Sequence, residues 1–121
     1  MSDIKIVIKA FRAPDDKEAC HRFVDGHMKV LKIYGITMIT SANVEWFDDP
    51  DTYVILVESE TGEKVYGGAR VQVAGGKYLL PIEKAVQDMD TSVHEEVMRK
   101  ARAGTAEFCG LWNSREVAGL G

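Results

Sequence analysis

The residues with the clearest capacity for chemistry lie near the C-terminal end of the chain. Glu107 stands in an alternating stretch between small and apolar neighbours. A carboxylate in such surroundings is partly desolvated, which raises its pKa toward the range useful to a general base. Gly119 and Gly121 follow as spaced glycines, and glycine lets bare backbone N–H groups approach a phosphate closely. The stretch therefore predicts a base and an anion-binding loop. The alternative for Glu107 is a strand-end carboxylate that faces solvent or pairs with a cation.

Residues 105–113 have the alternation of a β-strand, and residues 113–116 are polar and turn-forming. Successive side chains of a strand point to opposite faces, so both rows can be partly buried. The alternation assigns Phe108, Gly110 and Trp112 to one face and Glu107, Cys109, Leu111 and Asn113 to the other.

The N-terminal part of the chain predicts a strand followed by a helix. Residues 4–11 place apolar side chains on one face, as a strand does. Asp15 and Glu18 have the spacing of a capping box, which starts a helix. Apolar residues then recur at helical spacing as far as about Tyr34, and Gly35 is suited to end the helix.

The middle of the chain predicts a hairpin. Residues 52–58 are apolar on both faces, residues 59–63 form a turn with Gly62 in a left-handed position, and residues 64–74 return as a strand. The paired glycines at 67–68 indicate a bulge, a bend or close packing. Residues 36–40 fit a short strand or a turn of helix. The aspartates at 48–51 indicate a solvated turn rather than a metal site, because a calcium loop needs a glycine and a downstream glutamate.

Two short helices are predicted in residues 77–104. Pro81 suits the first position of one helix. Ser92 and Glu95 have capping-box spacing at the start of the other, and Gly104 suits its end. These helices lie between the third and fourth predicted strands. One interpretation of this segment is a packing insertion that covers the sheet surface.

This order of elements, together with the terminal glycine-spaced loop, resembles the N-terminal part of the GNAT superfamily of acyl-CoA-dependent N-acyltransferases. The family signature is R/Q-x-x-G-x-G/A, and Ala118 stands here where the family has Arg or Gln. The resemblance implies an α/β (α+β) fold: a mixed, largely antiparallel sheet with flanking helices. It also implies that residues 1–121 form a single, incomplete domain, the N-terminal half of a GNAT fold.

By the same resemblance, acetyl-CoA or another acyl-CoA is the co-substrate, a small-molecule or protein amine is the acceptor, and Glu107 is the base. The resemblance also implies, as the alternative to a packing insertion, that residues 77–104 shape the acceptor specificity. The half-domain alone is expected to be weak or inactive. Its central strand is expected to be an exposed edge through which copies of the chain form a homo-oligomer. The residues implied in cofactor binding are Leu111, Trp112 and Asn113 for the pantetheine arm and Ala118, Gly119, Leu120 and Gly121 for the pyrophosphate.

Two other function classes stay open: a non-catalytic domain that binds acyl-CoA or a partner, and an enzyme like the homoserine-lactone synthases. Arg70 could contact an acidic acceptor or form a surface salt bridge. The three histidines, His21, His27 and His94, are interpreted as structural or exposed, because no Ser/Asp or Cys partner pattern accompanies them.

The composition excludes several classes of function. A net charge of −4 argues against nucleic acid, which needs a basic face. No apolar run approaches the roughly 20 residues that span a bilayer, so no membrane association is expected. The N-terminus lacks the apolar region of a signal peptide, which predicts a cytoplasmic location. Cys20 and Cys109 have no metal-like spacing and are expected to be buried free thiols, and no metal site is predicted.

Overall fold

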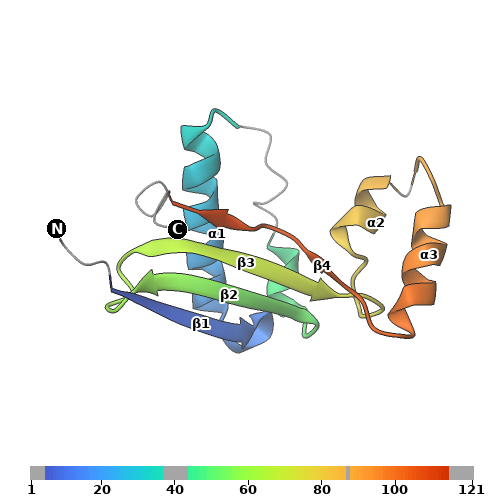
Figure 1. Ribbon diagram of the computed structural model, residues 1–121, viewed down its shortest axis with the longest axis horizontal. Helices are drawn as coiled ribbons and strands as arrows, with labels where there is room; N and C mark the ends of the chain where they lie inside the picture. The colour runs from blue at the N-terminus through green and yellow to red at the C-terminus, as the bar shows by residue number, and fades with distance from the viewer. Residues whose placement is uncertain (1–4, 37–43, 87, 115–121) are drawn as a thin grey trace.

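The computed structural model describes residues 5–36, 44–86 and 88–114 of the chain. An antiparallel sheet is crossed on one face by a long helix, which gives a mixed α+β architecture (Figure 1). The strands are ordered β1-β2-β3-β4, and β5 continues beside β3. In chain order the elements are β1 (Ile6–Arg12), η1 (Ala13–Asp15), α1 (Lys17–Ile33), η3 (Glu45–Asp48), β2 (Thr52–Ser59), β3 (Val65–Val73), α2 (Pro81–Val86), α3 (Ser92–Ala101), β4 (Ala106–Phe108) and β5 (Trp112–Asn113).

Helix α1 begins one residue later than its predicted cap. Asp16 is the N-cap, and its Oδ1 accepts a hydrogen bond from the Ala19 backbone N–H at 3.0 Å. The capping box predicted from Asp15 is wrong, because Asp15 belongs to the short 3₁₀ helix η1. The predicted end of the helix is confirmed: Gly35 has φ +74, a left-handed conformation that glycine adopts without strain.

The β2–β3 hairpin forms as the sequence predicts. Gly62 has φ +77 in the connecting turn. The register shifts between Val57 and Glu58, which pair with Gly67 and Val65, so one residue of β3 is bulged. The extra residue is Tyr66, next to the paired glycines, which keep their partners in β2. Of the three alternatives predicted for the glycines, close packing is confirmed, because a Cβ would lie 2.7 Å from the Trp112 carbonyl oxygen at Gly67 and 2.5 Å from the Ile55 carbonyl oxygen at Gly68.

The core lies between α1 and the sheet. Phe23 of α1 is at its centre and contacts the rings of Trp46 and Trp112 edge to face, with ring centroids 5.9 and 6.0 Å apart. The Cys20 thiol is also fully buried and donates to the Ala13 carbonyl oxygen at 3.4 Å. The buried core residues are Ala13, Ala19, Cys20, Phe23, Val24, Trp46, Phe47, Val54, Leu56 and Trp112.

The turn before β2 has a buried carboxylate. Asp49 is buried, and its two side-chain oxygens accept hydrogen bonds from the Asp51 backbone N–H at 2.9 Å and the Thr52 hydroxyl at 2.7 Å. The turn predicted at residues 48–51 is confirmed, but the prediction that it is solvated is wrong for Asp49. These bonds occupy the carboxylate within the turn itself, as aspartate often does before a strand.

The face of the sheet opposite α1 carries exposed apolar side chains. Ile6 and Ile8 of β1 are 48% and 64% exposed, and Phe108 of β4 is 72% exposed. The strand register places them on the same face as Val57 and Val71. In the part of the chain that the structure describes, no helix lies over this face (Figure 1). The position of β4 and β5 at one sheet edge agrees with the predicted edge strand, and self-association stays a prediction.

A buried carboxylate ties β1 and α1 to β2. Glu58 is 1% exposed, and its Oε1 lies 2.6 Å from Lys9 Nζ. Its Oε2 lies 3.4 Å from Arg22 Nε, within ion-pair distance but without hydrogen-bond geometry. Lys9 is therefore the closer of the two cations paired with this carboxylate. Loss of Lys9 leaves a buried charge that is only partly compensated.

We expect Lys9→Met to lower the free energy of unfolding by about 2 kcal/mol, because Glu58 then stays buried with Arg22 alone. Adding Glu58→Gln removes the charge while keeping the shape, so the double variant should recover about half of the loss. Urea unfolding of the two variants measures the difference. A double variant less stable than Lys9→Met contradicts this role of Glu58.

Helices α2 and α3 lie beside β4, beyond the end of the sheet, and not over its open face (Figure 1). Pro81 begins α2, as predicted. The capping box predicted at Ser92 is wrong: Thr91 is the N-cap of α3 and forms no side-chain cap bond. Instead the Ser92 backbone N–H donates to Asp90 Oδ1 at 3.0 Å, because an aspartate two residues earlier offers a nearer acceptor.

The strand predicted over residues 105–113 is interrupted. Gly110 has φ +93, which breaks the extended conformation and separates β4 from β5. As a result Cys109 and Trp112 are both buried on the helix-covered side, and Phe108 and Leu111 are 72% and 77% exposed. The predicted assignment of faces is wrong beyond this point, because one left-handed residue shifts the alternation of the residues after it.

Candidate functional site

The backbone of β5 is open on one side. The Ser114 N–H donates to the Tyr66 carbonyl oxygen at 2.7 Å, and Trp112 pairs with Gly68. Backbone groups alternate in direction along an antiparallel strand, so Asn113 directs its N–H and C=O away from β3. Among the described residues no strand pairs with this edge.

The three residues implied in pantetheine binding, Leu111, Trp112 and Asn113, therefore do not all face the open edge of β5. Asn113 presents its backbone at the open edge, and Leu111 is exposed just before it. Trp112 directs its backbone to β3 and its side chain into the core. The residues implied in pyrophosphate binding, Ala118 to Gly121, lie outside the described residues.

The Trp112 ring joins β5 to α1. It is stacked on the His27 ring, with centroids 5.9 Å apart and planes at 3°. Gly26 makes this contact possible, because a Cβ there would lie 2.4 Å from the Trp112 ring. Burial, and then the nearby Arg70 charge, lower the pKa of His27 below its usual value. The imidazole is therefore neutral at pH 7.

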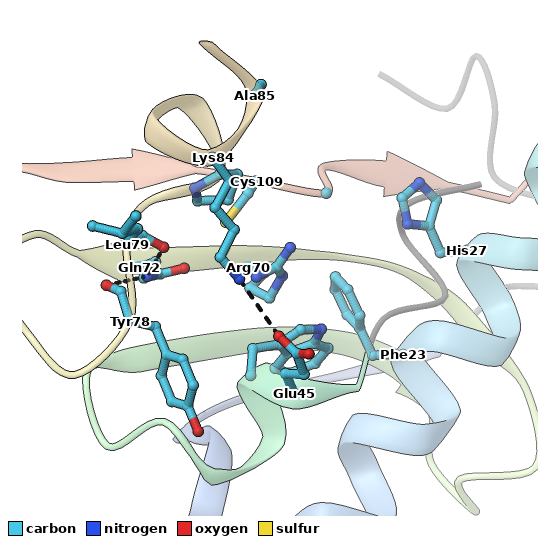
Figure 2. Close-up of a pocket in the computed structure, with 13 residues that line it drawn as sticks. Phe23, His27, Glu45, Arg70, Gln72, Tyr78, Leu79, Lys84, Ala85 and Cys109 are labelled. Atoms are coloured by element: carbon cyan, nitrogen blue, oxygen red, sulfur yellow. Dashed lines mark hydrogen bonds and ion pairs between the residues drawn. The ribbon is translucent and has the colours of Figure 1, made fainter. Parts of the chain in front are cut away.

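A cavity of about 490 Å³ opens on the helix-covered side, beside the break between β4 and β5. Such a volume lies within the range of small-molecule sites. Its floor includes Arg70 and Gln72 of β3, and Cys109 and Gly110 form the wall at the strand break (Figure 2). The other lining residues are Phe23, His27, Glu45, Trp46, Tyr78, Leu79, Pro81, Lys84 and Ala85.

Arg70 is the central charged group of this cavity. Its guanidinium carbon lies 4.9 Å from the centroid of the Trp46 ring, a cation–π contact. Burial lowers the pKa of Arg70, and the Cys109, Glu107 and Asp49 groups oppose that effect. Because the ordinary pKa of a guanidinium is so high, Arg70 remains charged.

The segment over the cavity is held by a side chain of the sheet. Gln72 Nε2 donates to the carbonyl oxygens of Tyr78 and Leu79, at 3.2 and 3.0 Å (Figure 2). On the other side, Lys84 Nζ lies 3.5 Å from Glu45 Oε2, which joins α2 to η3 across the opening. These contacts fix the walls of the cavity without occupying Arg70.

Glu107 is near this cavity but does not line it. Its Oε1 accepts a hydrogen bond from the Ile82 N–H in the first turn of α2, at 3.0 Å. It borders a second hollow, of about 530 Å³, between β4 and α3. Burial raises the pKa of Glu107, while the Ile82 hydrogen bond and Arg70 act in the opposite direction. The half-buried carboxylate is consistent with the environment expected of a base.

The described residues contain no cluster of metal-binding side chains. Cys20 and Cys109 are both free thiols, as predicted, and burial raises the pKa of each, that of Cys20 to about 11. No helix in the described part of the chain is long and apolar enough to span a membrane.

Sequence reasoning found Arg70 but assigned His27 to a structural role, and it did not associate Trp46 or Tyr78 with a site. These residues come together only because η3 and the segment before α2 fold over β3. The sequence did carry one signal for His27: it follows Phe23 by four residues, so both side chains lie on the same face of the predicted helix. Comparison of the chain with protein-family models, with curated proteins and with solved structures gives no match.

Proposed function

We propose that this chain binds acyl-CoA and takes part in acyl transfer from the thioester to an amine. The observation that carries the proposal is the broken edge strand: Gly110, at the break, lines the cavity, and no described strand pairs with the outward backbone groups of Asn113. An extended pantetheine arm, which has amide groups, can pair with such an edge as another strand would. The thioester would then lie at the break, next to the cavity.

In this reaction the amine nitrogen bonds to the thioester carbonyl carbon and the carbon–sulfur bond breaks. Because Glu107 does not line the cavity, the proton lost by the amine passes to it through a bridging water, and coenzyme A leaves as a thiolate that takes a proton from solvent. A carboxylate with a raised pKa suits this role, because it holds the proton more readily than an exposed one.

The segment of residues 77–104 contributes to the cavity through Tyr78, Leu79, Pro81, Lys84 and Ala85. This supports the proposal that the segment shapes the acceptor specificity. The alternative, that it covers the sheet, receives less support, because α2 and α3 lie beyond the end of the sheet (Figure 1).

The binding proposal is tested at Asn113. Asn113→Pro removes the outward N–H but no bond to β3, and proline is tolerated on such an edge. Losing one hydrogen bond should weaken acetyl-CoA binding by about 3- to 10-fold. Isothermal titration calorimetry of the chain with acetyl-CoA measures the effect.

The matched control is Asn113→Ala, which removes the same side chain and keeps the N–H, so its affinity should equal that of the unsubstituted chain. Equal affinities for the proline and alanine variants would contradict pairing at this edge. A chain that binds no acetyl-CoA contradicts the proposed function itself.

A further inference from the structure

The charges that line the cavity do not balance. Among the described residues that line it, Arg70 and Lys84 are cations, Glu45 is a carboxylate, and His27 is neutral. Lys84 and Glu45 are already within 3.5 Å of each other. Among the described lining residues, Arg70, which lies on the cavity floor, is therefore the cation without an ion-pair partner, and Glu107 and Asp49 act on it only from a longer distance (Figure 2).

Arg70 has no carboxylate partner within residues 5–36, 44–86 and 88–114. None of the ion pairs and side-chain hydrogen bonds between these residues includes its guanidinium, whose one close contact of this kind is with the Trp46 ring. Arg70 is only partly exposed, and a charge that has lost part of its hydration is stabilised by an opposite charge beside it. The planar guanidinium is also the group that binds a carboxylate through two parallel hydrogen bonds.

We infer that this cavity binds a small amine that carries a carboxylate, with the carboxylate on Arg70. The amine part of this inference rests on the proposed function, because the amine must reach the thioester at the strand break beside Cys109 and Gly110. The carboxylate follows from the cavity alone. A monoanion matches the single unpaired cation.

The walls indicate the rest of the ligand. Phe23, Trp46, Tyr78 and Leu79 present aromatic and aliphatic surface around Arg70. A pocket with one charged group and apolar walls orients a ligand by the charge and holds it by burial of apolar surface. The chemical class that fits is an α-amino acid with an apolar side chain.

The inference is tested by titrating the chain with L-leucine and L-phenylalanine and with their carboxamides, with tryptophan fluorescence as the readout because Trp46 stacks on Arg70. The acids should bind at least about 10-fold more tightly than the amides, since hydrogen bonds to a charged group contribute about 1.5–3 kcal/mol. This comparison uses the unsubstituted chain, so it does not depend on the folding of a variant.

A second comparison uses Arg70→Met, which keeps the volume and removes the charge, and Arg12→Met, whose side chain bonds the Pro50 carbonyl oxygen outside the cavity. The preference for acid over amide should disappear in Arg70→Met and persist in Arg12→Met. Equal binding of acid and amide, or no binding of either amino acid, overturns the inference. Acetyl-CoA titrations run in parallel separate this failure from a failure of the proposed function, since each ligand is measured without the other.

Discussion

Replacing Glu107 with glutamine is expected to reduce the rate of acyl transfer by a factor of about 10²–10⁴, the usual contribution of a general base. Glutamine keeps an oxygen that can accept the Ile82 N–H, so α2 should stay in place. The variant thus removes the proton acceptor and retains the local structure. The rate is measured as free thiol released from acetyl-CoA in the presence of an α-amino acid.

The pH dependence gives an independent readout. A base acts when deprotonated, and burial raises the pKa of Glu107 above its ordinary value of 4.5. The rate should therefore fall as the pH drops through that raised pKa, and this acid limb should be absent in Glu107→Gln. Unchanged kinetics in the variant contradict the role of Glu107, and acetyl-CoA binding without thiol release by the unsubstituted chain assigns it the non-catalytic binding role.

His27→Asn provides a matched comparison, because His27 is the neutral imidazole that lines the cavity. If Glu107 is the base, loss of His27 should change the rate much less than Glu107→Gln does. The opposite order of effects would assign the proton acceptor to His27 and leave Glu107 as the partner of α2.

The largest effect on stability is expected at Gly68, in the centre of the sheet. A Cβ there would lie 2.5 Å from the Ile55 carbonyl oxygen and 2.9 Å from the Phe23 ring. The backbone of β2 cannot move without breaking the ladder, and Phe23 is at the centre of the core. Gly68→Ala should therefore lower the free energy of unfolding by about 3 kcal/mol, as overpacking does.

Gly35→Ala is the control for Gly68→Ala. Nothing lies within 4 Å of a Cβ at Gly35, but its φ is +74. The cost there is conformational strain alone, about 1 kcal/mol. Chemical denaturation of both variants distinguishes the two causes, and a Gly68→Ala variant as stable as Gly35→Ala contradicts the packing argument.

Local signals predicted the elements well where a residue type dictates the backbone. The Gly62 turn, the end of α1 at Gly35 and the Pro81 start of α2 all appear where expected. The errors arise where neighbouring acceptors compete. Asp16 caps α1 in place of Asp15. The Ser92 backbone N–H donates to Asp90, whereas the predicted capping box would have paired it with Glu95.

The candidate site was less predictable than the fold. Glu107 and Arg70 were identified from their types, but alternation could not show that Gly110 adopts φ +93 and brings Cys109 and Trp112 to one side. A glycine has no side chain whose preference would reveal its φ. The cavity also needs contacts between residues far apart in the chain, such as Arg70 with Trp46 and Lys84 with Glu45, which no local pattern encodes.

The complete burial of the Cys20 thiol makes it a probe of local opening of the native state. Alkylating reagents attack the thiolate, and a buried thiol with a pKa of about 11 offers almost none at neutral pH. Cys20 is a residue of α1 whose thiol contacts η1 in the core, so a reagent reaches it only when α1 separates from the rest of the core. Its alkylation rate, followed separately from that of Cys109, therefore reports how often the native state opens.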